Sequence, residues 1–239
     1  MPTPNTGRGA GQHRAVLAVQ AEALPEAERP QPGPIAVLPR PEQAFVDAVE
    51  ASGGVVEPIS DATRGLVWLD YRDPDGFAAA LEAYPGIGWV QLPFAGVDAF
   101  SRTIAAESRP GRIWTSAKGA YAQPVAEHAL TLMLALLRVI PTRVRARSWA
   151  TEPEGRSLYG MDVVIIGAGG IALELIRLLE PFGVRITVVR RSSDPVPGAE
   201  RTVPTARLGD VLPTADLWWW RPPSPAARGS SSVRRSSPR

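Results

Sequence analysis

The chain has 239 residues, of which 44% are hydrophobic, enough to bury the core of one large or two ordinary domains. It contains no cysteine, which excludes disulfides and thiolate metal sites and favours a reducing, cytoplasmic setting. Its two histidines, His13 and His128, are too few for an ordinary zinc site, so we assign no metal ligands. The longest apolar stretch, residues 129–137, is interrupted by Thr131 and is too short to cross a membrane.

The net charge of +2 comes from one end of the chain. Residues 221–239 contain five arginines and no acidic residue, whereas residues 1–220 are mildly acidic overall. The basic character therefore belongs to a short tail rather than to the body of the protein. We expect no nucleic-acid partner. The alternative is that the Ser- and Arg-rich tail itself binds nucleic acid or another partner.

Residues 1–32 are rich in Pro, Gly and Ala, and we expect them to be a disordered leader without a secretory signal. From residue 33 the pattern changes to short apolar runs that alternate with helical segments. Such alternation predicts an α/β fold with a parallel sheet covered on both faces, and we assign it to residues 33–141. The strands are expected at 35–38, 55–56, 66–69, 89–92 and 111–115, and the helices at 41–51 and 77–84.

A longer helix is expected over residues 124–138, with Pro124 at its first position. From residue 129 onward it is apolar nearly all round, which predicts burial on several sides, between domains or subunits. His128 lies at the start of this apolar part, and we expect it to have a packing or interface role. Residues 142–157 are polar and are expected to connect two domains.

A glycine motif opens the second domain, which we assign to residues 158–217. The strand Val163–Ile166 leads into Gly167, Gly169 and Ala172 at the start of a helix, and a second strand follows at 184–189. In this pattern the first glycine permits a tight turn, the second lets the backbone approach a pyrophosphate, and the third small residue packs the helix on the strand. The free N–H groups of Gly170 and Ile171 would hold the phosphates. The alternative is a turn of the same shape that binds no ligand.

Residues beyond the second strand bear on which cofactor is bound. An NAD site usually has Asp or Glu about twenty residues after the glycines, where it accepts the ribose hydroxyls. This chain has Arg190 and Arg191 there, and arginine suits the extra 2′-phosphate of NADP. We therefore favour NADP, while the nearby Asp194 keeps NAD as the alternative.

Three segments, taken together, resemble the D-isomer specific 2-hydroxyacid dehydrogenase family: VQLPFAGVD at 90–98, GAYAQPVAEHALTLMLALLR at 119–138 and LYGMDVVIIGAGGIALELIRLLEPFGVRITVVRRS at 158–192. The resemblance implies a flavodoxin-like substrate domain that is interrupted by a Rossmann domain, with the active site between them. It also implies an NAD(P)-dependent oxidoreductase that oxidises a D-2-hydroxy acid or reduces a 2-keto acid. For full-length members it implies a homodimer.

The resemblance further implies a contact with the substrate carboxylate at Ala95 and Gly96. They belong to the turn Phe94–Asp98, which follows a predicted strand. A glycine after a strand lets backbone N–H groups approach an anion, which agrees with this role. Without the family, a plain turn at the start of a helix explains the same residues equally well.

The family uses a histidine, an arginine and an acidic residue for catalysis, and these follow the glycine motif. His128 precedes the motif, so it is not the acid/base histidine that the resemblance implies. No residue of this sequence matches the trio, and we assign no catalytic residue. We therefore expect the chain to be inactive, and a non-catalytic dinucleotide-binding protein is the alternative function.

Residues 218–239 depart from the expected pattern, and we expect them to form an aberrant, disordered tail. A fourth strand should begin here, but three tryptophans and Arg-Pro-Pro follow Leu217. With a GC-rich arginine codon, residues 218–221 (Trp-Trp-Trp-Arg) would be encoded by TGG TGG TGG CGG. One additional G before these codons changes the reading frame to GTG GTG GTG GCG, which encodes Val-Val-Val-Ala and suits that strand. We therefore interpret the tail as the product of a frameshift, which leaves an incomplete Rossmann domain and a truncated family member.

Overall fold

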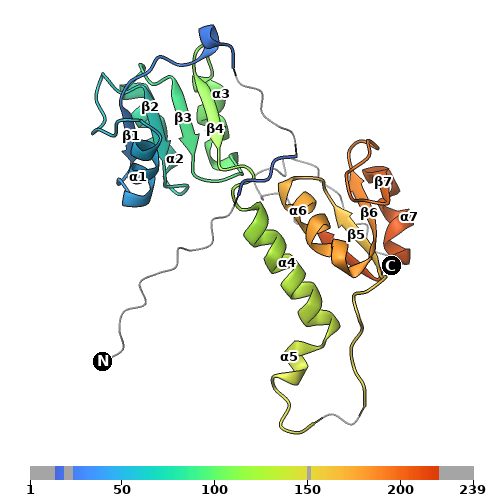
Figure 1. Ribbon diagram of the computed structural model, residues 1–239. Coiled ribbons are helices and arrows are strands. Elements are labelled where there is room, and N and C mark those ends of the chain that lie inside the picture. The colour runs from blue at the N-terminus through green and yellow to red at the C-terminus, as the bar shows by residue number, and fades with distance from the viewer. Residues whose placement is uncertain (1–13, 19–23, 150–151, 221–239) are drawn as a thin grey trace, which may run out of the picture. The chain divides into compact units, whose positions relative to one another are not determined.

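The computed structural model describes residues 14–18, 24–149 and 152–220, and these form two compact units (Figure 1). The N-terminal unit consists of residues 24–118. The C-terminal unit consists of residues 119–220 together with residues 14–18. The division between these compact units falls at 118/119, because the helix over residues 122–137 packs into the core of the C-terminal unit. The substrate domain predicted for residues 33–141 stays a prediction.

The N-terminal unit is built on a parallel four-stranded sheet in the order β1-β2-β3-β4. Every residue of β2 is buried, as expected for a central parallel strand that is covered on both faces. The strands are β1 (Ile35–Leu38), β2 (Gly65–Trp68), β3 (Trp89–Leu92) and β4 (Ile113–Ser116).

The predicted strand at 55–56 is reduced to a single bridge between Ile35 and Val56. The N–H of Ile35 donates to the carbonyl oxygen of Val55 (2.9 Å), and the carbonyl oxygen of Ile35 accepts from Glu57 (3.1 Å). Because the neighbouring carbonyl of Pro34 accepts from Gly65, this bridge lies on the edge of β1 opposite β2. Counting it as a strand gives the order 2-1-3-4-5, which is the flavodoxin-like order.

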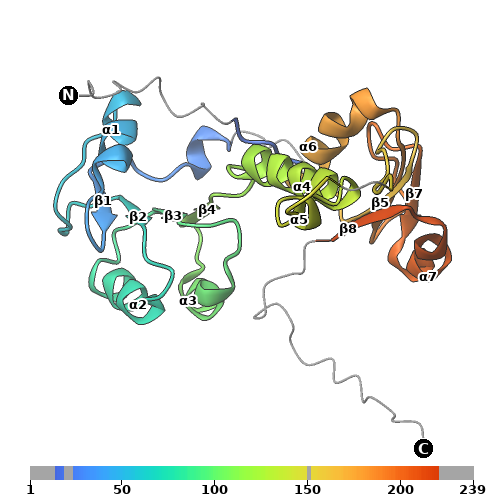
Figure 2. The same ribbon diagram turned by 90° about the horizontal axis from the view of Figure 1, so that it is seen from below.

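Helices cover both faces of this sheet. Figure 2 shows α1 on one face and α2 and α3 on the other. Pro74 occupies the first turn of α2, and the Asp73 carboxylate caps the helix by accepting from the N–H of Gly76 (2.8 Å). Phe77 of α2 packs edge-on against Phe100 in the core, with ring centroids 4.9 Å apart. The helical segments are η1 (Glu26–Glu28), α1 (Gln43–Ala51), α2 (Pro74–Ala83), η2 (Asp98–Phe100) and α3 (Ser101–Glu107).

The C-terminal unit has a second parallel sheet, in the order β7-β6-β5-β8. The strand order runs 3-2-1-4 along the chain, which is the first part of the Rossmann order. The α/β fold predicted for both halves is thus confirmed, although β7 was not predicted. The strands are β5 (Asp162–Ile166), β6 (Arg185–Arg190), β7 (Arg201–Pro204) and β8 (Leu217–Trp220).

Two helices, α4 and α6, cover one face of this sheet, and α7 covers the other. The remaining bounds are α4 (Ala122–Leu137), α5 (Ile140–Arg143), α6 (Gly170–Leu179), η3 (Glu180–Phe182), η4 (Thr205–Arg207), α7 (Leu208–Val211) and η5 (Leu212–Thr214). No helix in the described parts of the chain is long and apolar enough to span a membrane.

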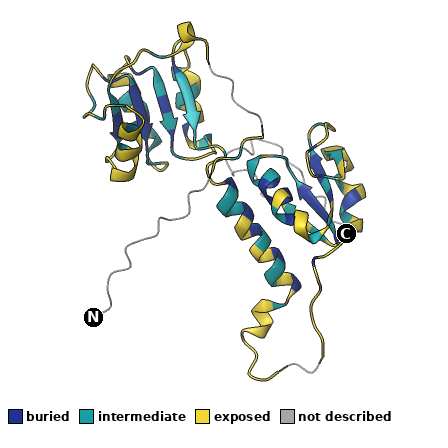
Figure 3. Cartoon of the chain, in the orientation of Figure 1, coloured by how far each residue is buried: buried dark blue, intermediate teal, exposed yellow. Residues whose placement is uncertain are grey.

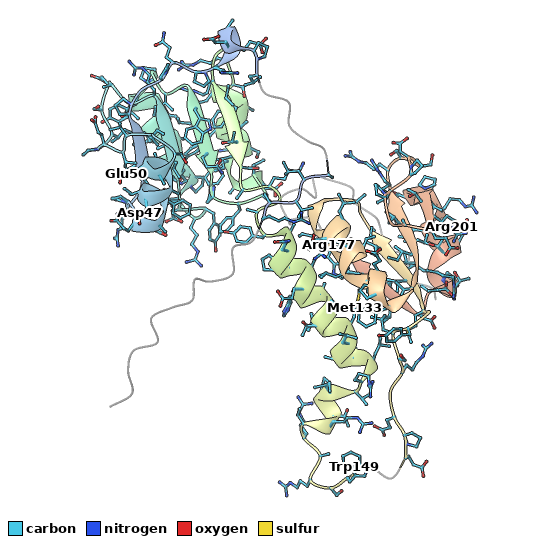
Figure 4. All side chains as sticks on the ribbon, in the orientation of Figure 1. Asp47, Glu50, Met133, Trp149, Arg177 and Arg201 are labelled. Atoms are coloured by element: carbon cyan, nitrogen blue, oxygen red, sulfur yellow. The ribbon has the colours of Figure 1, made fainter. Side chains whose placement is uncertain are left out.

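Within the single chain, α4 is buried along one stripe only, so its predicted burial on several sides, between domains or subunits, stays a prediction. A single stripe that includes Ala129 and Met133 packs against α6 and β5, whereas Leu132 and Leu136 are exposed. Figure 3 shows buried and exposed residues along α4. Figure 4 shows Met133 on α4. Pro124 is the third residue of α4 instead of the first, but it still lies in the first turn, where its missing N–H has no helical partner.

The expectation of disorder at the two ends of the chain is also corrected where the structure describes them. Residues 14–17 have no regular secondary structure but are hydrogen-bonded to the C-terminal unit, and residues 24–32 include η1. Trp218–Trp220 belong to β8, which pairs with β5 in regular register. Three tryptophans can occupy this strand because successive side chains of a strand point to opposite faces of the sheet. Trp219 faces the core, while Trp218 and Trp220 face solvent. Residues 1–13, 19–23 and 221–239 lie outside the described residues.

Candidate dinucleotide site

The first element of the site is the turn at Gly167, directly after β5. Gly167 has a φ of +104°, a value that L side chains rarely adopt. Its N–H donates to the carbonyl oxygen of Val189 at 2.7 Å, so the turn lies beside the end of β6. A glycine is required here because the chain must turn from β5 into α6 within three residues.

The second element is the start of α6, which supplies unpaired hydrogen-bond donors. Gly169 is the N-cap residue, and the helical bonding begins with the N–H of Leu173, which donates to the carbonyl of Gly169 at 3.0 Å. The N–H groups of Gly170, Ile171 and Ala172 precede that bond, and none has a partner among the described residues. Together with the positive end of the helix dipole, they form a set of donors suited to an anion.

The turn also lies at the place in the sheet where a ligand is expected to bind. β5 lies between β6 and β8, and the strand order reverses at β5. In open α/β sheets, ligands bind beyond the carboxyl ends of the strands at such a reversal. A side chain at Gly169 would meet no atom within 4 Å, so the space before the turn is open. Ala172 is buried between α6 and β5, as its small size requires.

Arg190 is the last residue of β6 and Arg191 follows it, next to the glycine turn. The carbonyl of Arg190 accepts from the hydroxyl of Thr205 (3.2 Å), which ties the strand end to the segment after β7. Neither guanidinium has a hydrogen bond or ion pair among the described residues. Asp194 accepts from Ser192 at 2.7 Å instead of pairing with an arginine. Both arginines thus lie at the end of β6 with no partner for their guanidinium donors among the described residues, and their role in a cofactor site stays a prediction.

A buried carboxylate in α6 was missed by the sequence reasoning. Glu174 is only 3% exposed and accepts from Arg177 at 2.6 and 2.9 Å and from Gln123 of α4 at 3.4 Å. The hydrogen bonds from Arg177 lower the pKa of Glu174, against the opposing effect of burial. The spacing of Glu174 and Arg177, three positions apart in a helix, was the available signal.

The proposed substrate contact lies in the N-terminal unit. Ala95 and Gly96 follow β3 in an exposed turn, and their N–H groups have no partner among the described residues. The ring of Phe94 contacts Tyr71 edge-on, with centroids 5.4 Å apart. The donors available to an anion are therefore present, although Asp98 lies close to Gly96.

Two further features of the described residues bear on the predictions. His128 is exposed on α4, so a packing role is wrong and an interface role remains a prediction.

A polar hollow of about 540 Å³ lies at the carboxyl ends of β1 and β2, and it was not predicted from the sequence. It is lined by Pro39, Arg40, Glu42, Leu69, Asp70 and Asp73. Within the described residues, no group of three or more His, Cys, Asp or Glu side chains could hold a metal ion.

Comparison with known proteins points to one family. Residues 130–225 match the NAD-binding domain of D-isomer specific 2-hydroxyacid dehydrogenases. An uncharacterised protein of Corynebacterium melassecola is 32% identical over 68% of this chain and 53% of its own length. Glyoxylate/hydroxypyruvate reductase HPR3 of Arabidopsis thaliana is 31% identical over 47% of this chain and 35% of its own length.

Solved structures of the same family have a similar fold. A family protein from Aeromonas salmonicida has a TM-score of 0.64 at 18% identity and covers 79% of this chain and 63% of its own. One from Xanthobacter autotrophicus, solved with NADPH and MES, has a TM-score of 0.63 at 21% identity over 79% of this chain and 62% of its own. The chain spans about half the length of the first curated relative that it matches. Through its NAD-binding domain, this chain belongs to the D-isomer specific 2-hydroxyacid dehydrogenase family.

Proposed function

We propose that the C-terminal unit binds NADP or NAD through the glycine turn and the start of α6. The observation that carries this proposal is the set of three unpaired N–H groups at Gly170, Ile171 and Ala172, placed where the strand order reverses. The open space before Gly169 lets a pyrophosphate approach the backbone. The family match to an NAD-binding domain supports the same assignment.

Within this proposal, Arg190 and Arg191 select NADP over NAD. Each guanidinium is a fork of donors that can bind a phosphate with two parallel hydrogen bonds. A ribose without the 2′-phosphate would leave those donors unused, and no carboxylate at the end of β6 replaces them. Asp194 is held by Ser192, which weakens its case as a ribose ligand.

The reaction proposed for the family fold is the reduction of a 2-keto acid or the reverse oxidation of a D-2-hydroxy acid. The bound nicotinamide would supply the hydride, and Ala95 and Gly96 would bind the substrate carboxylate through their N–H groups. Because no residue of this sequence matches the family's acid/base histidine, we expect the 239-residue chain to bind dinucleotide without turnover. A dinucleotide-binding protein without catalysis is the second candidate function, and measurable turnover would argue against it.

A homodimer through α4 and the following segment is also proposed. Leu136 of α4 is 67% exposed, and Trp149, labelled in Figure 4 beyond α5, is 89% exposed. Large exposed apolar side chains along one face are typical of a subunit interface.

We propose no nucleic-acid partner, because residues 1–220 are mildly acidic overall. The absence of cysteine suits a protein that works in the cytoplasm.

The experiment that tests dinucleotide binding compares two glycine-to-alanine variants. Gly169 and Gly209 both have open space around an added Cβ, and neither has a positive φ. Gly169→Ala puts a methyl group where the pyrophosphate would lie, whereas Gly209→Ala changes α7, far along the chain from the turn. Titration with NADPH and NADH should show weaker binding for Gly169→Ala alone. Equal affinities for both variants and the parent would reject the site, and so would the absence of binding by the parent.

A further inference from the structure

Residues 14–17 lie across the start of the two helices that frame the proposed dinucleotide site. The N–H of Val16 donates to the carbonyl of Gly119 at 3.1 Å, and the N–H of Arg14 donates to the side-chain oxygen of Gln123 at 2.8 Å. The guanidinium of Arg14 lies 3.8 Å from the buried carboxylate of Glu174. Backbone and side chain thus both attach this segment to α4 and α6.

Two glycines make room for the segment. A side chain at Gly170 would clash directly with the carbonyl oxygen of Val16, and one at Gly119 would lie 2.6 Å from the same oxygen. Gly119 also has a φ of +85°, which favours glycine independently. The carbonyl of Val16 therefore fits into a slot that only glycine at position 170 leaves open.

This slot adjoins the donors that a pyrophosphate would use. Gly170 carries the first of the unpaired N–H groups of α6, and the Val16 carbonyl lies against this residue with its negative end toward the positive end of the helix. A phosphate oxygen would be drawn to the same end of the helix for the same reason. A phosphate oxygen bound to the N–H of Gly170 would lie close to the carbonyl oxygen of Val16, and the two negative oxygens would repel each other.

We propose that residues 14–17 act as an internal competitor that the dinucleotide must displace. The inference rests on the proposed dinucleotide site. Binding requires the segment to leave, so the apparent affinity is reduced by the fraction of molecules in which it has left. Two backbone donor bonds and one partly exposed ion pair are enough to lower the apparent affinity about tenfold.

The test measures NADPH binding by the full chain, by the chain without residues 1–18 and by Arg14→Glu. Arg14→Glu replaces the attraction to Glu174 by repulsion. Arg29→Glu is the control, because it makes the same charge change at a side chain that donates to the Leu24 carbonyl and has no ion pair among the described residues. We expect about tenfold tighter binding for the truncated chain, a smaller gain for Arg14→Glu and none for Arg29→Glu. Equal affinities, or weaker binding without the segment, would overturn the inference.

A second readout keeps the inference distinct from the proposed function. Hydrogen exchange at the Val16 N–H, followed by mass spectrometry of peptides that cover residues 14–18, should become faster when NADPH is added to the full chain. If NADPH binds and this exchange is unchanged or slower, the inference fails while the dinucleotide site stands. If neither the full nor the truncated chain binds NADPH, the proposed function fails and the inference fails with it.

Discussion

Gly167 and Val189 are joined by a hydrogen bond of 2.7 Å from the N–H of the glycine to the carbonyl of the valine. This bond fixes the turn after β5 to the last buried residue of β6, so the turn proposed to bind phosphate and the strand end proposed to bind ribose share one anchor. Both the backbone conformation of Gly167 and the path of β6 are therefore parts of the same site.

The first prediction is that Gly167→Ala destabilises the protein, whereas Gly169→Ala has a smaller effect on stability. The φ of +104° at Gly167 strains any L side chain, and we expect a cost of about 1–2 kcal/mol in the free energy of unfolding. Denaturant unfolding followed by circular dichroism measures it. Equal stability of the parent and Gly167→Ala would show that the turn has another conformation in solution.

The second prediction concerns cofactor preference. Arg190→Asp should shift the ratio of NADPH to NADH affinity toward NADH, because a carboxylate repels the 2′-phosphate and accepts from ribose hydroxyls. Arg191→Asp, made singly, shows which arginine matters. Titration of both cofactors against the parent and both variants gives the ratios. An unchanged ratio for a variant would remove that arginine from the site.

The third prediction is a pH dependence of stability that comes from Glu174. Its pKa is lowered in the folded protein by the hydrogen bonds from Arg177, so its stabilising effect is present above the unfolded pKa of about 4.3. This stabilisation is lost as the pH falls through the lower folded pKa. Glu174→Gln should cost about 1–2 kcal/mol at pH 7 and less at acidic pH.

The control for Glu174 is Asp210, which also pairs with an arginine three positions away but is exposed. Asp210→Asn should change the free energy of unfolding by less than about 0.5 kcal/mol. Urea unfolding at several pH values between about 3 and 7, a range that spans the pKa of ordinary carboxylates, measures both variants. A cost for Glu174→Gln that does not depend on pH would show that packing, not ionisation, is responsible.

The fourth prediction concerns self-association. Leu136→Glu should shift a dimer toward the monomer, because it places a charge in the apolar face of α4. Val55→Glu is the control, since Val55 is exposed in the other unit. Light scattering at several concentrations gives the mass. A parent protein that is monomeric at every concentration would contradict the proposed interface.

The fifth prediction links the tryptophan run to activity. The 239-residue chain should not reduce glyoxylate, pyruvate or hydroxypyruvate with either cofactor. Inserting one G after the Leu217 codon should place valines opposite Val164–Ile166 in the register that the tryptophans now occupy, and should lead into a frame that encodes Arg, an acid and His. Turnover by the unmodified chain would refute the argument and make His128 the first residue to mutate.

Much of the fold could be predicted from the sequence because the signals were local. β3 was predicted with the bounds that the structure has, and the glycine motif lies between a strand and a helix as expected. β7 was missed because four residues that begin with Arg201 and end with Pro204 lack an apolar run, and pairing with β6 forms the strand. Glu174 was missed because its burial depends on Gln123, which is distant in sequence.

The separation of the hydrophobic cores between the two units has a consequence for any measurement of unfolding. One core belongs to the N-terminal unit and centres on Phe77 and Phe100, while the others belong to the C-terminal unit. Such a chain need not melt in one cooperative step, and a calorimetric enthalpy larger than the van't Hoff value would reveal two transitions. Trp68, Trp89 and Trp114 lie in one unit and the other four tryptophans in the other, so fluorescence will report a mixture of both.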